Sequence, residues 1–141
     1  MPTALKPVPI LGRILLALIF VQGGIGKLGN PARTATEMAS HGIPFANILI
    51  YGVILVELGG GLMVIAGLYA RCAATVLFFY TLALAVLFHA YWAAAPAAQG
   101  TQHALFFGHL SMMGGMLIVA AFGAGPLSLD ALRERSASAA R

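Results

Sequence analysis

Four long apolar segments dominate the pattern of hydrophobic and polar positions along the chain. They cover about residues 9–28, 46–68, 73–92 and 103–122, and each is close to the ~20 residues that a helix needs to cross a bilayer. Only residues 69–72 separate the second segment from the third, so these two must be antiparallel neighbours. The pattern predicts an all-α integral membrane protein, built as an antiparallel four-helix transmembrane bundle.

The connection between the first two segments has the signals of a short helix of its own. Asn30 can cap a helix N-terminus, and Pro31 suits the first helical position. Gly42 and Pro44 then provide a stop. We therefore expect an interfacial helix over about residues 31–41 on the outer surface of the bundle, which either covers an opening between the spans or serves as an ordered connector.

The chain after the fourth segment predicts one more short helix and a tail. Residues 123–126 contain two glycines and a proline, which end the fourth span. Ser128 can then cap an amphipathic turn or two through Arg135. Because the last residues are small and polar, we expect residues 131–141 to form a flexible cytoplasmic tail. Residues 1–141 are expected to form a single membrane domain.

The composition suits lipid rather than water. Hydrophobic residues make up 60% of the chain and charged residues 9%, whereas a soluble domain carries about a quarter charged residues. A soluble chain of 141 residues could not bury this much apolar surface in its interior. The net charge of +4 comes from basic residues near the segment ends. Membrane orientation explains such residues, so we expect no nucleic-acid partner.

The basic residues are divided unequally between the two sides of the predicted bundle. One side holds only Lys27 and Arg33, and residues 93–102 on that side contain no Lys or Arg. The other side holds the rest, namely Lys6, Arg13, Arg71, Arg133, Arg135 and Arg141. Because cytoplasmic loops are enriched in Lys and Arg, we expect both termini in the cytoplasm. The first segment lacks a small-x-small cleavage site, so we interpret it as a retained span.

The single cysteine, Cys72, restricts the redox chemistry that the chain can perform. One cysteine forms neither an internal disulfide nor a C-x-x-C pair. A quinone-linked thiol oxidase of the disulfide-generating type is therefore excluded.

One carboxylate, Glu57, lies in the middle of the second apolar segment. An ionisable group at this depth is costly and marks a function or a buried partner. Gly60 and Gly61 share its helix face, which indicates that Glu57 points into the bundle. We expect Arg13 to reach Glu57 from the cytoplasmic side and form an ion pair, while Lys27 extends outward to the membrane boundary.

Two histidines, His89 and His109, lie at similar depth in the outer halves of the third and fourth spans. They could share a pocket between neighbouring helices, with Glu57 and His89 as candidate proton carriers. The candidate ligand-binding residues are then Arg13, Lys27, Glu57, His89 and His109. In the structural alternative, each imidazole bonds a carbonyl or lies in a polar interface beside Tyr91 and Trp92.

A haem or copper site is a further alternative for the same histidines. A bis-histidine haem would use both imidazoles, and a copper site would add methionine sulfur. The candidate copper ligands are His89, His109, Met112, Met113 and Met116. Methionine at helical spacing is more often gap-filling, so no metal site is assigned.

Short motifs with glycine and polar residues follow one another through all four spans. They are GRILLA (12–17), GGIGKL (23–28), VELGGG (56–61), LFH (87–89), GG (114–115), GP (125–126) and SLD (128–130). In order and spacing, over about residues 11–130, they resemble the DoxX family of small bacterial inner-membrane proteins. The resemblance implies a four-helix bundle in the inner membrane. It also implies that Arg13, Lys27, Glu57 and His89 occupy the family's polar positions, with His109 near a fourth one.

The resemblance further implies a loose link to redox chemistry. Relatives include a subunit of thiosulfate:quinone oxidoreductase and a partner of oxidative-stress enzymes. Our first hypothesis is a redox-associated component that binds a quinone or another small ligand in an outer-half pocket, as a possible accessory subunit of a quinone-linked oxidoreductase. The second is a non-catalytic scaffold or assembly partner of a redox or stress complex, and a small transporter is the third. Expected partners are the lipid bilayer, redox-enzyme subunits and further copies of the chain.

Overall fold

The computed structural model describes residues 6–140, which form helices joined by short turns. Four helical segments are long and apolar enough to cross a membrane. They are α1 (Val8–Gly29); α3 (Ala46–Leu55) continued by the π-helical turn η2 (Val56–Gly60) and α4 (Gly61–Ala66); α5 (Ala70–Phe88), followed by the short turn η3 (Tyr91–Ala93); and α6 (Pro96–Phe122). The predicted all-α architecture with four candidate spans is confirmed. Only α6 differs clearly in extent, because Pro96 occupies its first turn and starts the helix seven residues earlier than expected.

Two shorter helices flank the spans. The helix α2 (Pro31–Ser40) begins where the sequence predicts it, with the Asn30 side chain accepting a hydrogen bond from the backbone N–H of Arg33 at 3.2 Å. The helix α7 (Leu129–Ala139) is capped by Ser128, as expected. It continues beyond Arg135 to Ala139, so most of the expected tail is helical. Arg141 lies outside the described residues.

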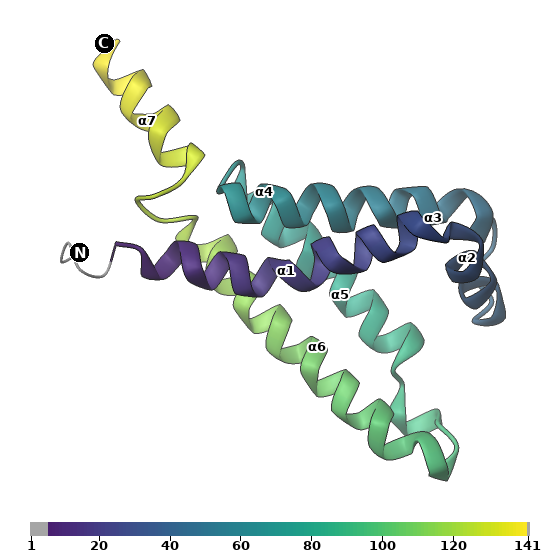
Figure 1. Cartoon of the computed structure of the whole chain (residues 1–141). Helices are drawn as coiled ribbons and strands as arrows, with labels where there is room; N and C mark the ends of the chain where they lie inside the picture. The colour runs from purple at the N-terminus through teal and green to yellow at the C-terminus, as the bar shows by residue number, and fades with distance from the viewer. Residues whose placement is uncertain (1–5, 141) are drawn as a thin grey trace.

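The spans form two pairs rather than a bundle that is closed at both ends (Figure 1). In one pair α1 packs on the second span, and in the other α5 packs along α6. The pairs meet near α4, at the end from which α7 extends, and diverge toward α2 (Figure 1). As a consequence, α5 packs against α4 and η2, whereas α3 has few contacts with it.

Small residues explain why the pairs approach closely at only one end. The core there contains Ala17, Ala70, Ala73 and Ala74, which are at most 4% exposed. A Cβ added to Gly115 of α6 would lie 2.8 Å from a methyl carbon of Leu16 in α1, closer than carbon atoms pack. Small residues on a transmembrane face let two backbones approach in this way.

The diverging end has its own apolar cluster, formed mainly by α2 and α3. Its buried members are Ala35, Met38, Ala46, Ile50 and Ile54. The segment after α2 also reaches the other helix pair, because the rings of His41 and Phe88 lie 4.5 Å apart. Thus α2 bridges the gap between α3 and the end of α5, and it covers the space that the diverging pairs leave.

Candidate functional site

The mid-span carboxylate Glu57 forms an ion pair with Lys27 of α1. The ammonium Nζ of Lys27 lies 2.9 Å from Oε1 and 2.8 Å from Oε2 of Glu57. Glu57 is 4% exposed, as its inward-facing glycine neighbours predicted. Within residues 6–140 this is the only ion pair between Lys or Arg and Asp or Glu.

The expected pairing of Arg13 with Glu57 is wrong, and so is the expected outward extension of Lys27. Side chains on a helix lean toward its N-terminus. On α1 that direction carries Lys27 back toward the membrane centre and carries Arg13 away from it. Arg13 instead donates from Nη2 to the backbone oxygen of Leu127 at 2.7 Å.

Glycine residues on α1 provide the space for the ion pair. Gly23 lies one turn before Lys27, and a Cβ at this position would be 3.4 Å from Nζ of Lys27 and 3.2 Å from Oε2 of Glu57. Any larger side chain at residue 23 would therefore press on both charged groups. The spacing Gly23-x-x-x-Lys27 is a sequence signal for Lys27 that the expected pairing did not take into account.

A third residue, Tyr80 of α5, completes the network and was not anticipated. Its hydroxyl donates to Oε1 of Glu57 at 2.5 Å. Counted from the tight turn that joins the two helices, Glu57 and Tyr80 lie at nearly equal depth. Antiparallel neighbours place such residues side by side, so the depth count could have identified Tyr80. The network joins α1, η2 and α5.

Glu57 also lies in the one irregular turn of the second span. Residues Val56–Gly60 form a π-helical turn, η2. Such turns are rare and are frequently found at functional sites. Gly60 ends this turn against α5, where an added Cβ would lie 3.1 Å from the Leu77 side chain. The irregular turn therefore coincides with the charge network and with a close approach of the two helix pairs.

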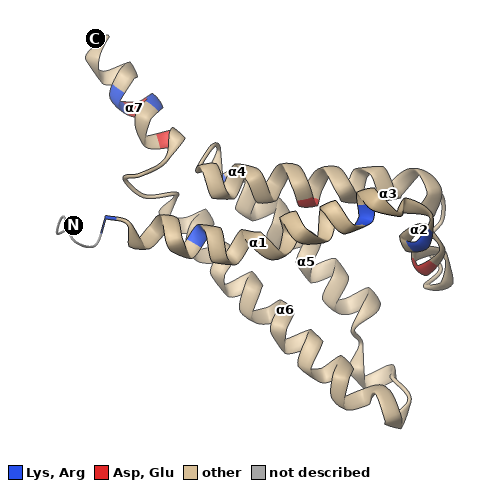
Figure 2. Cartoon of the chain, viewed as in Figure 1, with Lys and Arg blue, Asp and Glu red and all other residues tan. Residues whose placement is uncertain are grey.

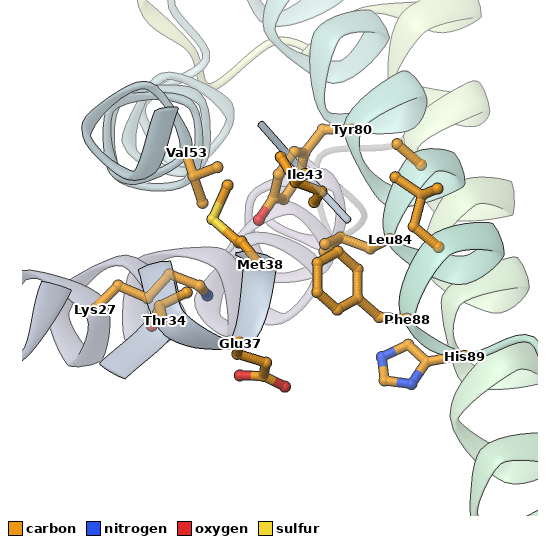
Figure 3. Close-up of a pocket in the computed structure, with 12 residues that line it drawn as sticks. Lys27, Thr34, Glu37, Met38, Ile43, Val53, Tyr80, Leu84, Phe88 and His89 are labelled. Atoms are coloured by element: carbon orange, nitrogen blue, oxygen red, sulfur yellow. The ribbon is translucent and has the colours of Figure 1, made fainter. Parts of the chain in front are cut away.

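A cavity of about 360 Å³ lies beside the network, between α2 and α5. Four of its lining residues carry polar chemistry, namely Lys27, Glu37, Tyr80 and His89. Figure 3 shows the carboxylate of Glu37 and the imidazole of His89 facing each other across the opening. The rest of the lining is mainly apolar and comprises Met38, Ile43, Val53, Ala83, Leu84, Leu87 and Phe88, with Thr34.

A second, smaller cavity of about 180 Å³ lies on the other side of the ion pair. Lys27 and Leu84 line both cavities, whereas Glu57, His109 and Met112 line only the smaller one. Five residues that the sequence singled out therefore surround the two spaces, with Lys27 between them. Arg13 is not among the residues that line either cavity.

The two candidate histidines lie together at the junction of α5 and α6. The ring centroids of His89 and His109 are 4.7 Å apart. Nδ1 of His89 lies 2.8 Å from Oε1 of Gln102, and Nδ1 of His109 lies 2.8 Å from the backbone oxygen of Leu105. Each ring therefore has one nitrogen engaged by α6 and one left over.

The metal and haem alternatives gain nothing from this geometry. The direct contact between the two rings leaves no space for a porphyrin between them. Among the described residues, no group of three or more His, Cys, Asp or Glu side chains is arranged to hold a metal ion. Met116 is fully buried in the apolar core. Met112 shares the smaller cavity with His109, so copper binding there stays a prediction.

Comparison with known proteins places the chain among inner-membrane proteins. Residues 8–90 match the DoxX family. Inner membrane protein YqjF of Escherichia coli (strain K12) is 34% identical over 87% of this chain and 89% of its own length. Inner membrane protein YphA of the same organism is 33% identical over 90% of this chain and 91% of its own length. No solved structure matches the chain significantly.

Proposed function

Since the chain belongs to the DoxX family and is a multi-pass inner-membrane protein, we propose that it binds an uncharged, quinone-type carbonyl compound between α2 and α5. One observation carries this proposal. Two members of the Lys27–Glu57–Tyr80 network, Lys27 and Tyr80, line a mainly apolar cavity between α2 and α5. Ligand sites typically combine apolar walls with a few converging polar groups.

The ion pair beside the cavity favours an uncharged ligand, and the carboxylate of Glu37 at the opening disfavours an anion. Lys27 and Glu57 neutralise each other, so a charged compound would have to compete with a buried ion pair. The ammonium of Lys27 has three N–H donors and uses two on Glu57. The third donor is free for a carbonyl oxygen of the ligand, and Lys27 itself lines the cavity.

His89 supplies the complementary group at the opening. Its Nδ1 is engaged by Gln102. When the amide oxygen of Gln102 accepts the Nδ1 proton, neutral imidazole keeps Nε2 as an acceptor. An acceptor of this kind can take a proton from the hydroxyl of a reduced quinone. In this proposal His89 carries protons, while Glu57 holds Lys27 and Tyr80 in position.

The size of the site agrees with this ligand class. A volume of about 360 Å³ lies at the lower end of the ~300–1,000 Å³ that ligand pockets occupy. That space accommodates one substituted ring. Because both helix pairs expose apolar side chains around it, a hydrocarbon tail would extend between the helices into lipid.

Extraction of the purified protein tests the proposal. The protein is purified in mild detergent, and its bound lipids are analysed for quinones, haem and metals. We expect a quinone to accompany the wild type and to fall severalfold in Lys27→Met and His89→Ala. His103→Ala is the matched control, because His103 is exposed near the same end and lines neither cavity. A wild type without quinone, or equal retention in all variants, contradicts the proposal.

A non-catalytic scaffold is the second candidate, and the same network favours it. Glu57, Lys27 and Tyr80 link three of the four spans, so they could serve only to specify helix packing. Under this function, Lys27→Met and Glu57→Gln would weaken assembly with partner subunits or with further copies of the chain, and no ligand would be lost. Measuring copurified ligand and assembly size on the same preparations separates the two functions.

A further inference from the structure

We propose that the end of the molecule opposite α2 contains a binding site for a phosphate group, formed by Arg71 and Arg133. The site is a cavity of about 740 Å³ where α5 begins, α6 ends and α7 begins. It shares no lining residue with the two cavities around Lys27. The proposal therefore stands independently of quinone binding.

The two arginines reach this cavity from different helices. Arg71 lies in the first turn of α5, and a Cβ built on Gly123 would be 3.3 Å from its Nε, so its guanidinium lies over the turn after α6. Arg133 of α7 donates from Nη2 to the Tyr69 hydroxyl at 2.8 Å, and its guanidinium carbon lies 4.4 Å from the centre of that ring. Tyr69 thus fixes Arg133 at the cavity wall.

Neither guanidinium group has a carboxylate partner in the described part of the chain. No acidic side chain within residues 6–140 forms an ion pair with Arg71 or Arg133. Asp130 lines the same cavity, but its two oxygens accept the backbone N–H groups of Tyr69 and Ala70 at 2.8 and 2.9 Å. It caps the start of α5 and is occupied there. Glu134 is the other acidic residue of the lining.

A third arginine adds buried positive charge next to this cavity. Arg13 is 3% exposed, and its Nε and Nη1 have no hydrogen-bond partner in the described part of the chain. A Cβ on Gly67 would overlap Nη1 of Arg13 and would also crowd Ser128 and Ala124. Ser128 and Ala124 line the cavity, so the Arg13 guanidinium lies directly behind its wall.

These groups match a phosphodiester anion in charge and geometry. In the lining, Arg71 and Arg133 balance Asp130 and Glu134, and Arg13 behind the wall adds one net positive charge. Guanidinium forks bind phosphate oxygens in pairs, and they do so better than point charges. Phe122, which lines the cavity and is 80% exposed, provides an apolar surface for an acyl chain. Glycerophospholipid headgroups and free phosphate esters both supply this phosphate chemistry.

Native mass spectrometry with defined ligands tests the site. Delipidated protein in detergent is titrated with short-chain phosphatidylglycerol, and in a second arm with inorganic phosphate. We expect Arg71→Gln and Arg133→Gln each to weaken phosphatidylglycerol binding about tenfold, the effect of losing one charge-assisted contact. Arg135→Gln is the matched control, because Arg135 lies on the same helix but outside this cavity.

The design separates the site from general electrostatic attraction and from misfolding. Equal losses of phosphatidylglycerol affinity in all three variants, or no loss of affinity in any of them, overturn the proposal. Arg71 makes no side-chain hydrogen bond or ion pair within residues 6–140, so its substitution removes neither kind of contact from the fold. Displacement of the lipid by inorganic phosphate at similar concentration would support the site and assign it to free phosphate. Failure of phosphate to displace it would assign the site to the lipid.

Discussion

At the scale of single residues, the mid-membrane charge is explained by its neighbours. Glu57 accepts hydrogen bonds from Lys27 and Tyr80 while almost fully buried. A buried carboxylate without such partners would be strongly destabilising. Both donors, Lys27 and Tyr80, are therefore needed to keep Glu57 buried. The position of Gly23 beside both charges shows how the sequence makes room for the arrangement.

The ion pair predicts a specific pattern of coupled mutations. Lys27→Met should lower the free energy of unfolding in detergent by roughly 3 kcal/mol, because it leaves the buried Glu57 carboxylate without its partner. Glu57→Gln should lower it by less, because the Lys27 side chain that loses its partner is 24% exposed. The double variant should lose less than the sum by more than ~1 kcal/mol. In the comparison cycle, Arg13→Met and Glu57→Gln should be additive within about 0.5 kcal/mol. Coupling of Arg13 but not Lys27 would contradict the structure.

The hydroxyl of Tyr80 should also contribute measurably to stability. Tyr80→Phe removes one hydrogen bond to a charged group, which is worth about 1.5–3 kcal/mol, and leaves the ring in place. Tyr51→Phe removes the same atom from a side chain that is 61% exposed on α3, and it should change stability by less than ~0.5 kcal/mol. Equal effects in a thermal or denaturant unfolding series would show that Tyr80 does not hold Glu57.

At the scale of helices, glycine determines where spans approach closely. A Cβ on Gly24 of α1 would lie 2.6 Å from Cγ of Leu58 in η2, whereas Gly26, two residues later, has nothing within 4 Å. Gly24 and Gly26 thus lie in the same helix at similar depth, but only Gly24 is packed against another helix. The π-helical turn lies at this contact, so helix spacing and the position of Glu57 depend on each other.

This difference gives a prediction for a pair of glycine variants. Gly24→Ala should destabilise the protein by about 1–3 kcal/mol, since it forces a methyl group into a packed interface. Gly26→Ala should change stability by less than ~1 kcal/mol, because only helix propensity is affected. Unfolding midpoints in one detergent provide the measurement. Similar losses at both positions would mean that α1 and η2 are not in contact.

The positions of the helices could be predicted from the sequence better than the side-chain contacts between them. Apolar length located the spans, and capping residues located α2 and the start of α7. Facing glycines indicated that Glu57 is buried, and equal depth indicated that His89 and His109 could meet. Arg13 was wrongly expected as the partner of Glu57, because only the length of its side chain was considered. The direction in which helical side chains lean was left out. Tyr80 was missed because a phenol within a span is unremarkable until its neighbour is known.

At the scale of the whole molecule, two helix pairs meet at one end and α2 covers the space at the other (Figure 1). Charged residues gather near the two ends, since α6 carries none along its length while α2 carries two and α7 carries four (Figure 2). The divergence of the pairs was not predictable, because it depends on which small residues face each other across sequence-distant helices. It is this divergence that creates the cavity beside Lys27.

We propose that α7 lies in the cytoplasm and α2 on the opposite side, as the distribution of Lys and Arg indicates. In a Cys72→Ala background, single cysteines test this orientation at exposed residues of the two helices, through Thr36→Cys in α2 and Ser138→Cys in α7. A membrane-impermeant thiol reagent, with the outer membrane permeabilised, should label residue 36 in intact cells. Residue 138 should react only after the inner membrane is opened. Labelling of residue 138 but not residue 36 in intact cells would show that the orientation is the reverse of the one proposed.

The central claim, a quinone-type ligand between α2 and α5, is tested most directly by photolabelling. Purified protein in lipid nanodiscs is illuminated with an azido-substituted short-chain quinone, and the labelled peptides are sequenced by mass spectrometry. We predict attachment within Pro31–Ser40 and residues 80–89, which line the cavity, and suppression by excess unlabelled quinone. Labelling spread over lipid-exposed helix faces, or labelling that excess quinone does not suppress, would contradict the account.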